Sequence, residues 1–240
     1  MSIEATETIG EIVRRHARET PDAAALMSED QNPLTYRGLA SVMDRIQASL
    51  NAAGFGRGDR VATVGRSDAA NAALVVGIWS CAAAVPMNPA LSADEFAAYL
   101  RELKVQGVAV DATMDTPARA AAQEAGLPLL EVEATDHRVA GMIDIRPGAP
   151  AGTPASPDPA QLDDLGVVML TSGTTSRSKV VPVPHRHLSI KAGRFARALE
   201  LAPSDRCLNL MPMFHVHGLY CALGGTLVGG GSLISLPEFS

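Results

Sequence analysis

A run of six small residues, 171–176, is the part of this 240-residue sequence that is best suited to bind an anion. The run reads TSGTTS, so five side chains carry a hydroxyl and the sixth residue is glycine, and Lys179 follows closely. Glycine and small side chains let backbone N–H groups approach an anion, and the hydroxyls and the ammonium add further donors. The run therefore predicts a loop that binds phosphate oxygens.

Two other interpretations of this run compete with a phosphate loop. A Walker loop, G-x-x-x-x-G-K-[ST], needs glycine where Ser178 stands and Ser or Thr where Val180 stands, so the Walker pattern is excluded. A flexible turn rich in small residues fits the composition as well as a phosphate loop does. The surrounding elements and motifs must decide between the loop and the turn.

The elements that position the run follow an α/β pattern. Residues 165–170 are an apolar run typical of a central strand, so the loop leaves the carboxyl end of a strand, where open α/β sheets bind ligands. Strand and helix signals alternate upstream, which predicts an α/β fold of layered, mostly parallel sheets flanked by helices. We expect helices at 9–19, 35–54, 94–103 and 117–125, and strands at 23–27, 34–36, 61–64, 107–110 and 128–132.

A proline-rich segment interrupts this pattern. Residues 146–161 read RPGAPAGTPASPDPAQ and hold five prolines, a composition that predicts an exposed linker. We therefore expect a first α/β subdomain over 1–145, a linker over 146–162, and the start of a second α/β subdomain over 163–240. The second subdomain would carry the phosphate loop.

Charge and composition exclude several classes of protein. A net charge of −6 gives no broad attraction for nucleic acid or for an anionic membrane surface. The uncharged stretch 69–85 is rich in alanine and contains Asn71, so we expect a helix buried against a sheet rather than a membrane span. The three cysteines form no C-x-x-C pair, and the first residues lack the order of a secretory signal. These features indicate a cytoplasmic protein.

The segment LTSGTTSRSKVVPVPHRHL resembles the phosphate-binding signature of the AMP-forming acyl-adenylating enzymes, which include acyl-CoA synthetases, peptide-synthetase adenylation domains and luciferase. Their usual pattern is T-S-G-[ST]-T-G-x-P-K-G. The matching positions are Thr171, Ser172, Gly173, Thr174, Thr175 and Lys179. Ser176, Ser178 and Val180 depart from it, which leaves open a non-catalytic α/β module for binding or assembly. The T-S-R-x-K variant is also similar to oxalate-CoA ligases, so Ser176 fits a subgroup of the family.

Three further motifs resemble the same family, in the family's order. LTYRGLASVMDRIQASLNAAGFGRGDRV resembles its L-T-Y-x-E-L helix followed by G-x-x-x-G-D-R-V, and AVPMNPALS resembles its A-x-x-x-P-[LM]-N-P loop. LNLMPMFHVHGL, residues 208–219, is similar to P-[LM]-F-H-x-x-G. Together the motifs span nearly the whole chain, which is identified as a member of this superfamily.

The resemblance implies a two-step ligase. A carboxylate attacks the α-phosphorus of ATP to give an acyl adenylate and pyrophosphate, and coenzyme A then displaces AMP. The protein's task in the first step is to position the reactants and to neutralise phosphate charge. The resemblance assigns His215 and Lys179 to catalysis, Thr174 to Mg²⁺, and to ATP or AMP the residues Thr171, Ser172, Gly173, Thr174, Thr175, Ser176 and Lys179.

Two pairs of histidines allow a different site. H-R-H at 185–187 and H-V-H at 215–217 would each place two imidazoles on one face of an extended chain, so a zinc site can be drawn. No carboxylate or cysteine lies at a supporting spacing, and His215 belongs to the P-[LM]-F-H-x-x-G motif. We therefore expect no zinc and a carboxylate-orienting role for His215, whereas His217 has no such support.

The family's Y-G-x-[ST]-E motif, its ribose-binding aspartate and its C-terminal lysine have no counterpart in these 240 residues. We therefore expect a truncated N-terminal part of an ATP-dependent carboxylate-CoA ligase, without full activity by itself and with apolar surface exposed for self-association. The partners of the whole enzyme would be a small carboxylic acid, ATP and coenzyme A. Oxalate or another short acid is a guess from the loop variant, and a longer acyl or an aryl acid stays open.

Overall fold

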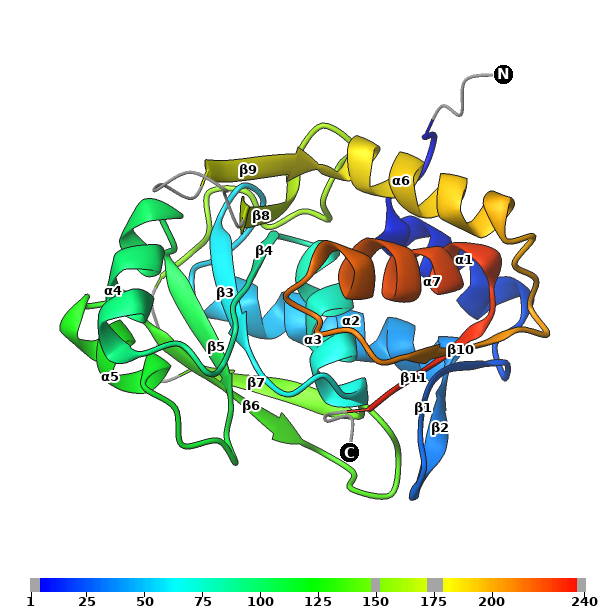
Figure 1. Ribbon diagram of the computed structural model, residues 1–240, viewed down its shortest axis with the longest axis horizontal. Helices are drawn as coiled ribbons and strands as arrows, with labels where there is room; N and C mark the ends of the chain where they lie inside the picture. Colours follow the sequence, from blue (N-terminus) through cyan, green and yellow to red (C-terminus); the bar gives the residue numbers. More distant parts are fainter. Residues whose placement is uncertain (1–4, 148–151, 172–178, 237–240) are drawn as a thin grey trace.

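Two β-sheets and the helices around them make up residues 5–147, 152–171 and 179–236, which the computed structural model describes (Figure 1). The larger sheet has seven strands in the order β7-β6-β5-β3-β4-β8-β9, and the smaller has four in the order β10-β11-β1-β2. The pairs β1/β2, β6/β7 and β8/β9 are antiparallel, and the other pairs are parallel. This is the layered, mostly parallel α/β fold that the sequence predicts.

The strands of the larger sheet are short, and the interior ones are mostly apolar, as expected of parallel strands that are buried on both faces. They are β3 (Arg60–Val64), β4 (Ala83–Pro86), β5 (Gly107–Asp111), β6 (Leu129–Ala134), β7 (Ile143–Pro147), β8 (Leu165–Thr171) and β9 (Lys179–Pro184). The smaller sheet consists of β1 (Ala24–Ser28), β2 (Gln31–Thr35), β10 (Arg206–Asn209) and β11 (Ser232–Ser235). The predicted central strand at 165–170 is confirmed, because β8 lies between β4 and β9.

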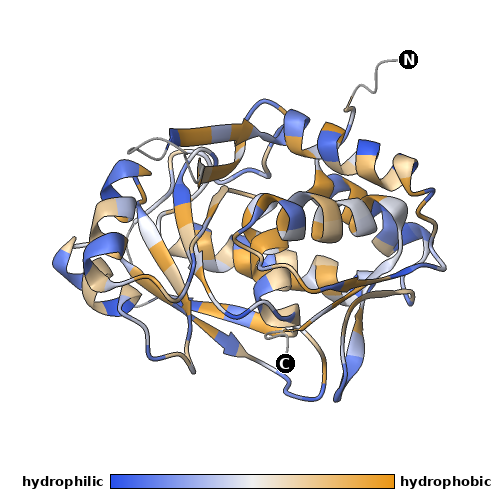
Figure 2. Ribbon diagram, in the orientation of Figure 1, coloured by the Kyte–Doolittle hydropathy of each residue, from blue (hydrophilic) through white to orange (hydrophobic). Residues whose placement is uncertain are grey.

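Alternate side chains of the larger sheet face two separate cores. Val61 of β3 packs into a core shared with the smaller sheet, whereas Ala62 and Val64 pack into a second core beneath α4 and α5. Figure 2 shows hydrophobic residues gathered on these strands and on the helices next to them. The helices are α1 (Ile9–Glu19), α2 (Tyr36–Ala52), α3 (Ala69–Trp79), α4 (Ala93–Glu102), α5 (Ala118–Glu124), α6 (His185–Ala198), the π-helix η1 (His217–Gly225) and α7 (Thr226–Gly229).

Polar residues at the helix starts explain why the predicted boundaries are nearly right. Thr8 and Glu11 cap α1 reciprocally, since the Glu11 N–H donates to Thr8 Oγ1 at 3.2 Å and the Thr8 N–H donates to Glu11 Oε2 at 2.7 Å. Ser92 and Glu95 form the same box at the start of α4. Ser92 therefore caps α4, which begins one residue before the predicted helix start at 94.

The uncharged stretch 69–85 is buried, as predicted, and it consists of a helix followed by a strand. α3 ends at Trp79, and the chain turns through Ser80, whose N–H donates to the Gly77 carbonyl at 3.1 Å, before β4 begins at Ala83. Eleven helical residues span only about 16 Å, roughly half the thickness of a bilayer core. Within the part of the chain that the structure describes, no helix is long and apolar enough to cross a membrane.

The sequence does not predict the two antiparallel edge strands, β7 and β9. β9 reads KVVPVP, and the prolines Pro182 and Pro184 cannot donate to a neighbouring strand, which argues against an interior strand but is tolerated at an edge. β7 reaches Pro147 and so overlaps the start of the predicted linker. Because proline is typical of loops, the sequence pattern does not reveal either edge strand of the larger sheet.

Residues 152–162 of the predicted linker are hydrogen-bonded to α2, through Gln47 and Asn51, and to the turns around Arg57 and Ser80. The Arg57 N–H donates to the Ser156 carbonyl at 2.9 Å, and the Ala160 N–H donates to the Ser80 carbonyl at 2.8 Å. Both sheets also take strands from either side of this segment, because β8 and β9 join β3–β7 while β10 and β11 join β1 and β2. Seven of the eleven residues 152–162 are nevertheless exposed, and both the linker and the division into two subdomains stay predictions.

Candidate functional site

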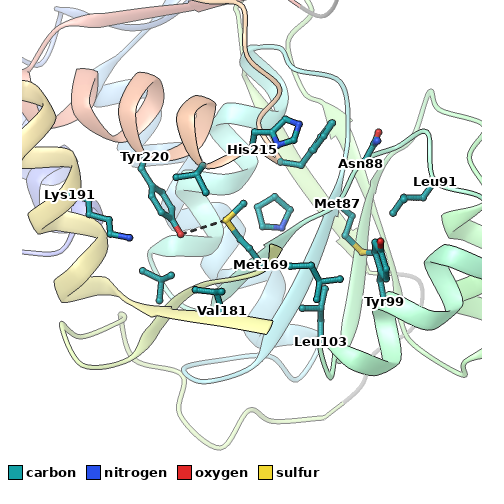
Figure 3. A pocket seen from close by; sticks show the side chains of 15 residues that line it. Met87, Asn88, Leu91, Tyr99, Leu103, Met169, Val181, Lys191, His215 and Tyr220 are labelled. Atoms are coloured by element: carbon teal, nitrogen blue, oxygen red, sulfur yellow. Dashed lines mark hydrogen bonds between the residues drawn. The ribbon is translucent and has the colours of Figure 1, made fainter. Parts of the chain in front are cut away.

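A cavity of about 520 Å³ opens at the carboxyl ends of the neighbouring strands β4 and β8 (Figure 3). Its walls come from the loop after β4, from α4, from β8 and β9, from α6, and from the chain between Phe214 and Tyr220. In open parallel sheets this edge is where ligands bind. The cavity is therefore the place to compare with the residues that the sequence singles out.

The described wall of the cavity is mainly apolar, and Tyr220 is held in contact with Met169 and Lys191 there. The hydroxyl of the buried Tyr220 donates to Met169 Sδ at 3.6 Å, and burial raises the pKa of Tyr220 to about 12. The Lys191 ammonium lies 5.4 Å from the centre of the Tyr220 ring, within the range of a cation–π contact. These side chains combine a dry surface with one positive charge.

His215 lies on the cavity wall, as expected for a residue that contacts the reacting groups. Its side chain is exposed, and its ring lies 4.8 Å from the ring of Phe214. Its backbone N–H donates to the Pro212 carbonyl and its carbonyl accepts from the Leu219 N–H, both at 3.0 Å. The backbone of His215 is thus anchored on both sides while the imidazole stays accessible.

The segment before His215 is tied to the smaller sheet. The Asn209 side chain accepts from the Met211 N–H at 3.0 Å and donates to Ser235 Oγ at 3.1 Å. The Met213 N–H donates to Ser67 Oγ at 3.1 Å, and the Met213 side chain is fully buried. β10, β11 and the turn after β3 therefore fix the place of His215 together.

Gly218 explains the spacing of the motif that contains His215. A Cβ atom at this position would lie 2.5 Å from the Pro212 carbonyl oxygen and 2.8 Å from that of Met211. Such distances are far below van der Waals contact, so the first turn of η1 packs directly on this backbone. Glycine three residues after the histidine is required by the path of the chain.

The structure places Thr171 and Lys179 opposite each other, at the end of β8 and the start of β9. Val180, one of the departures from the family pattern, pairs with Leu170 in the same ladder. Ser172, Gly173, Thr174, Thr175 and Ser176 lie outside the described residues, so their phosphate contacts and the Mg²⁺ role of Thr174 stay predictions. β8 ends at Thr171, so the run 171–176 begins at the carboxyl end of the strand, as predicted.

His185 belongs to the core and not to the cavity. It is fully buried against Gly166, and neither ring nitrogen has a hydrogen-bond partner among the described residues. Burial lowers the pKa of His185 to about 4, although the Asp164 carboxylate acts in the opposite direction. A histidine in this setting is neutral at physiological pH.

The two histidine pairs do not lie on extended chain. His185 begins α6 and His217 begins η1, where the His217 ring packs edge-on against Phe195 at 6.2 Å. Over residues 5–147, 152–171 and 179–236, no group of three or more His, Cys, Asp or Glu side chains is arranged to hold a metal ion. The i, i+2 argument for a zinc site therefore does not apply, because side chains two apart on a helix point in different directions.

Lys191 and Tyr220 line the cavity without any signal in the sequence that marks them. Lys191 follows Leu188 by three residues on α6, and that spacing also fits an ordinary exposed lysine beside a buried stripe. Tyr220 lies two residues beyond the quoted motif position Gly218. Only the packing of α6 against η1 brings the two side chains together.

Comparison with known proteins agrees with this geometry. The family model of the AMP-binding enzymes matches residues 13–240. The chain is 31% identical to a sulfoacetate–CoA ligase of Cupriavidus necator over 99% of this chain and 46% of the relative. It is 28% identical to an oxalate–CoA ligase of Arabidopsis thaliana over 97% of this chain and 45% of the relative. The chain thus spans about half the length of the curated relatives it matches.

Solved structures share the fold over nearly the whole chain. ATP-bound MatB from Rhodopseudomonas palustris superposes with a TM-score of 0.75 at 25% identity, over 98% of this chain and 46% of that one. O-succinylbenzoate coenzyme A synthetase from Bacillus subtilis, in complex with AMP, gives 0.76 at 25% identity, over 95% and 56%. With the family model matched from residue 13 onward, the chain belongs to the AMP-binding enzyme family.

Proposed function

We propose that this chain supplies the phosphate loop and the acid-binding cavity of an ATP-dependent carboxylate–CoA ligase. The observation that carries the proposal is the position of the cavity, which lies at the end of β8 where the loop begins and has His215 on its wall. Several curated relatives are named as ligases of an acid with coenzyme A. The reaction would join a carboxylate to AMP with release of pyrophosphate, and then to coenzyme A with release of AMP.

In this proposal His215 holds the reacting carboxylate. Its imidazole is exposed at the cavity wall while its backbone is anchored, so a ring N–H can donate to one carboxylate oxygen and leave the other free to attack phosphorus. The apolar wall around Met169 and Tyr220 would exclude water from the acyl adenylate. Positioning and the exclusion of water are what this step requires of the protein.

The phosphate groups would lie at the loop between Thr171 and Lys179. Backbone N–H groups, hydroxyls and the Lys179 ammonium would offset the negative charge that the attack redistributes on phosphate. The described residues offer no carboxylate cluster for Mg²⁺, so the ion would be held mainly by ATP phosphates and water, with Thr174 as the proposed protein ligand. Bound in this way, Mg²⁺ would supply further charge neutralisation.

Calorimetric titration of the 240-residue chain with Mg·ATP and with pyrophosphate tests the proposal. We expect saturable binding that weakens about tenfold in Lys179→Met, because a charge-assisted phosphate contact is removed. Arg194→Met is the matched control, since it removes one positive charge from an exposed position on α6 that does not line the cavity. Equal affinities in all three proteins, or no binding by the unchanged chain, would contradict the proposal.

A further inference from the structure

Lys191 brings a positive charge to the acid-binding cavity. Among the described residues that line the cavity, Lys191 is the only lysine or arginine, and none is an aspartate or a glutamate. The neighbouring wall consists of apolar or neutral side chains such as Met169, Val181 and Tyr220. The cavity is therefore suited to a ligand that brings negative charge with it.

The ammonium of Lys191 is held at the cavity by the Tyr220 ring. Its Nζ lies 5.4 Å from the ring centre, and Figure 3 shows the side chain directed toward Tyr220. Tyr220 is itself fixed, since it is buried and its hydroxyl donates to Met169 Sδ. A cation–π contact orients a lysine while leaving its N–H donors available to a ligand.

The α6 helix explains why Lys191 faces this way. Leu188 and Ala192 are fully buried and define the inner face of the helix, and Lys191 lies at the border of that face. Its aliphatic stem can follow the apolar surface while its charge reaches the cavity. Lys191 and Arg194 are both exposed, but Arg194, one turn later, does not line the cavity.

We infer that Lys191 selects acids with a second anionic group, namely dicarboxylates or carboxylates with a sulfonate. This inference rests on the proposed function, in which the first carboxylate lies at His215. A monoacid with an alkyl or aryl tail would place apolar atoms against the ammonium and displace its water without replacing the lost hydrogen bonds. A second anionic group restores those bonds and forms an ion pair, so the acid's far end is recognised by charge.

Succinate and butyrate form the matched pair of probes, because both have four carbons and differ only in the second carboxylate. Calorimetric titration of the 240-residue chain should give about fivefold tighter binding of succinate, the effect of one partly exposed ion pair. In Lys191→Met, which keeps an unbranched apolar stem, the ratio of the two affinities should fall to about one. Lys191→Arg should keep the preference, and Arg194→Met should behave as the unchanged chain.

The possible outcomes separate this inference from the proposed function. Binding of both acids without preference, lost in His215→Ala, would overturn the selectivity of Lys191 and leave the acid site in place. No binding of either acid would overturn both. AMP serves as the third titrant: an unchanged acid ratio with weaker AMP binding in Lys191→Met would assign Lys191 to the nucleotide phosphate and overturn the inference.

Discussion

His185 and His215 lie thirty positions apart in two segments of similar pattern, H-R-H and H-V-H, yet their surroundings are opposite. His185 is fully buried, has no hydrogen-bond partner among the described residues and has a pKa lowered to about 4. His215 is exposed on the wall of a cavity. The comparison shows that burial and the neighbouring backbone, rather than residue type or spacing, separate a core histidine from a candidate site residue.

The two segments also differ in what holds them. His185 begins a regular helix and fills space against Gly166 of β8. His215 lies in an irregular segment that depends on Asn209 and on the close approach of Gly218 to the backbone. Changes at His185 should therefore alter stability, and changes around His215 should alter binding.

The largest expected effect is on the pH dependence of stability. Because the folded pKa of His185 is about 4 and its ordinary value is 6.5, the unfolded chain takes up the proton first as the pH falls. The contribution is therefore fully present above pH 6.5 and is lost as the pH falls toward 4. The loss should reach about 3 kcal/mol, at about 1.4 kcal/mol per pH unit.

Urea unfolding of the unchanged chain and of His185→Leu, across this pH range, measures the effect. Both proteins share all other titrating groups, so the difference between their pH profiles isolates His185. Parallel profiles would show that His185 does not titrate as a buried, neutral histidine.

Removing the buried ring is expected to have the next largest effect. His185→Ala should lower the free energy of unfolding by about 2 kcal/mol. The cost of the cavity that is left should exceed the gain from removing two buried nitrogens that have no hydrogen-bond partner among the described residues. His185→Leu fills the same space with apolar atoms and should stay within about 1 kcal/mol of the unchanged chain. Equal losses in both variants, measured by denaturant midpoints at pH 7, would mean that His185 has a polar role.

A smaller loss of stability is expected at Gly218, on the His215 side. Gly218→Ala should cost about 1–2 kcal/mol, because its Cβ must push away the Pro212 carbonyl, and it should weaken acid binding by moving His215. Gly193→Ala is the control, since a Cβ there meets no atom within 4 Å and should stabilise α6 by about 0.5–1 kcal/mol. Thermal unfolding measures the change in stability, and calorimetric titration measures the change in acid binding. If Gly218→Ala altered neither, the claim that glycine is required three residues after His215 would be wrong.

The smallest change of stability is expected for His215→Ala, within about 0.5 kcal/mol, because the side chain is exposed. The same variant should lose most of its affinity for a carboxylate. His187→Ala removes another exposed imidazole, one that does not line the cavity, and should change neither property. A strong loss of stability in His215→Ala would instead show that His215 has a structural role, as His185 does.

Local signals predict much of the fold. The helical spacing of 35–54 and the apolar run before Thr171 locate α2 and β8 to within two residues, because each signal depends on nearby side chains. The edge strands β7 and β9 are not predicted, since their prolines resemble loop residues, although each pairs with the strand just before it. The contacts of residues 152–162 with distant parts of the chain are not predicted either, because such contacts produce no pattern in the local sequence.

The candidate site is predictable only where a motif contains it. Thr171, Lys179 and His215 come from motifs, and the structure places the first two at neighbouring strand ends and the third on the cavity wall. Lys191 comes from packing alone, because the contact of α6 with η1 decides where its charge lies. Residues that surround a ligand but belong to no motif can be identified only once the fold is known.

The central claim is that the cavity beside β8 binds a carboxylate next to His215. Nuclear magnetic resonance of the six histidine rings during titration with succinate tests it directly, with His215→Ala and His185→Leu used to assign the signals. The account predicts a saturable shift of the His215 signals and no shift of those of the buried His185. Unmoved His215 signals at saturating acid, or a shift at His185 alone, would contradict it.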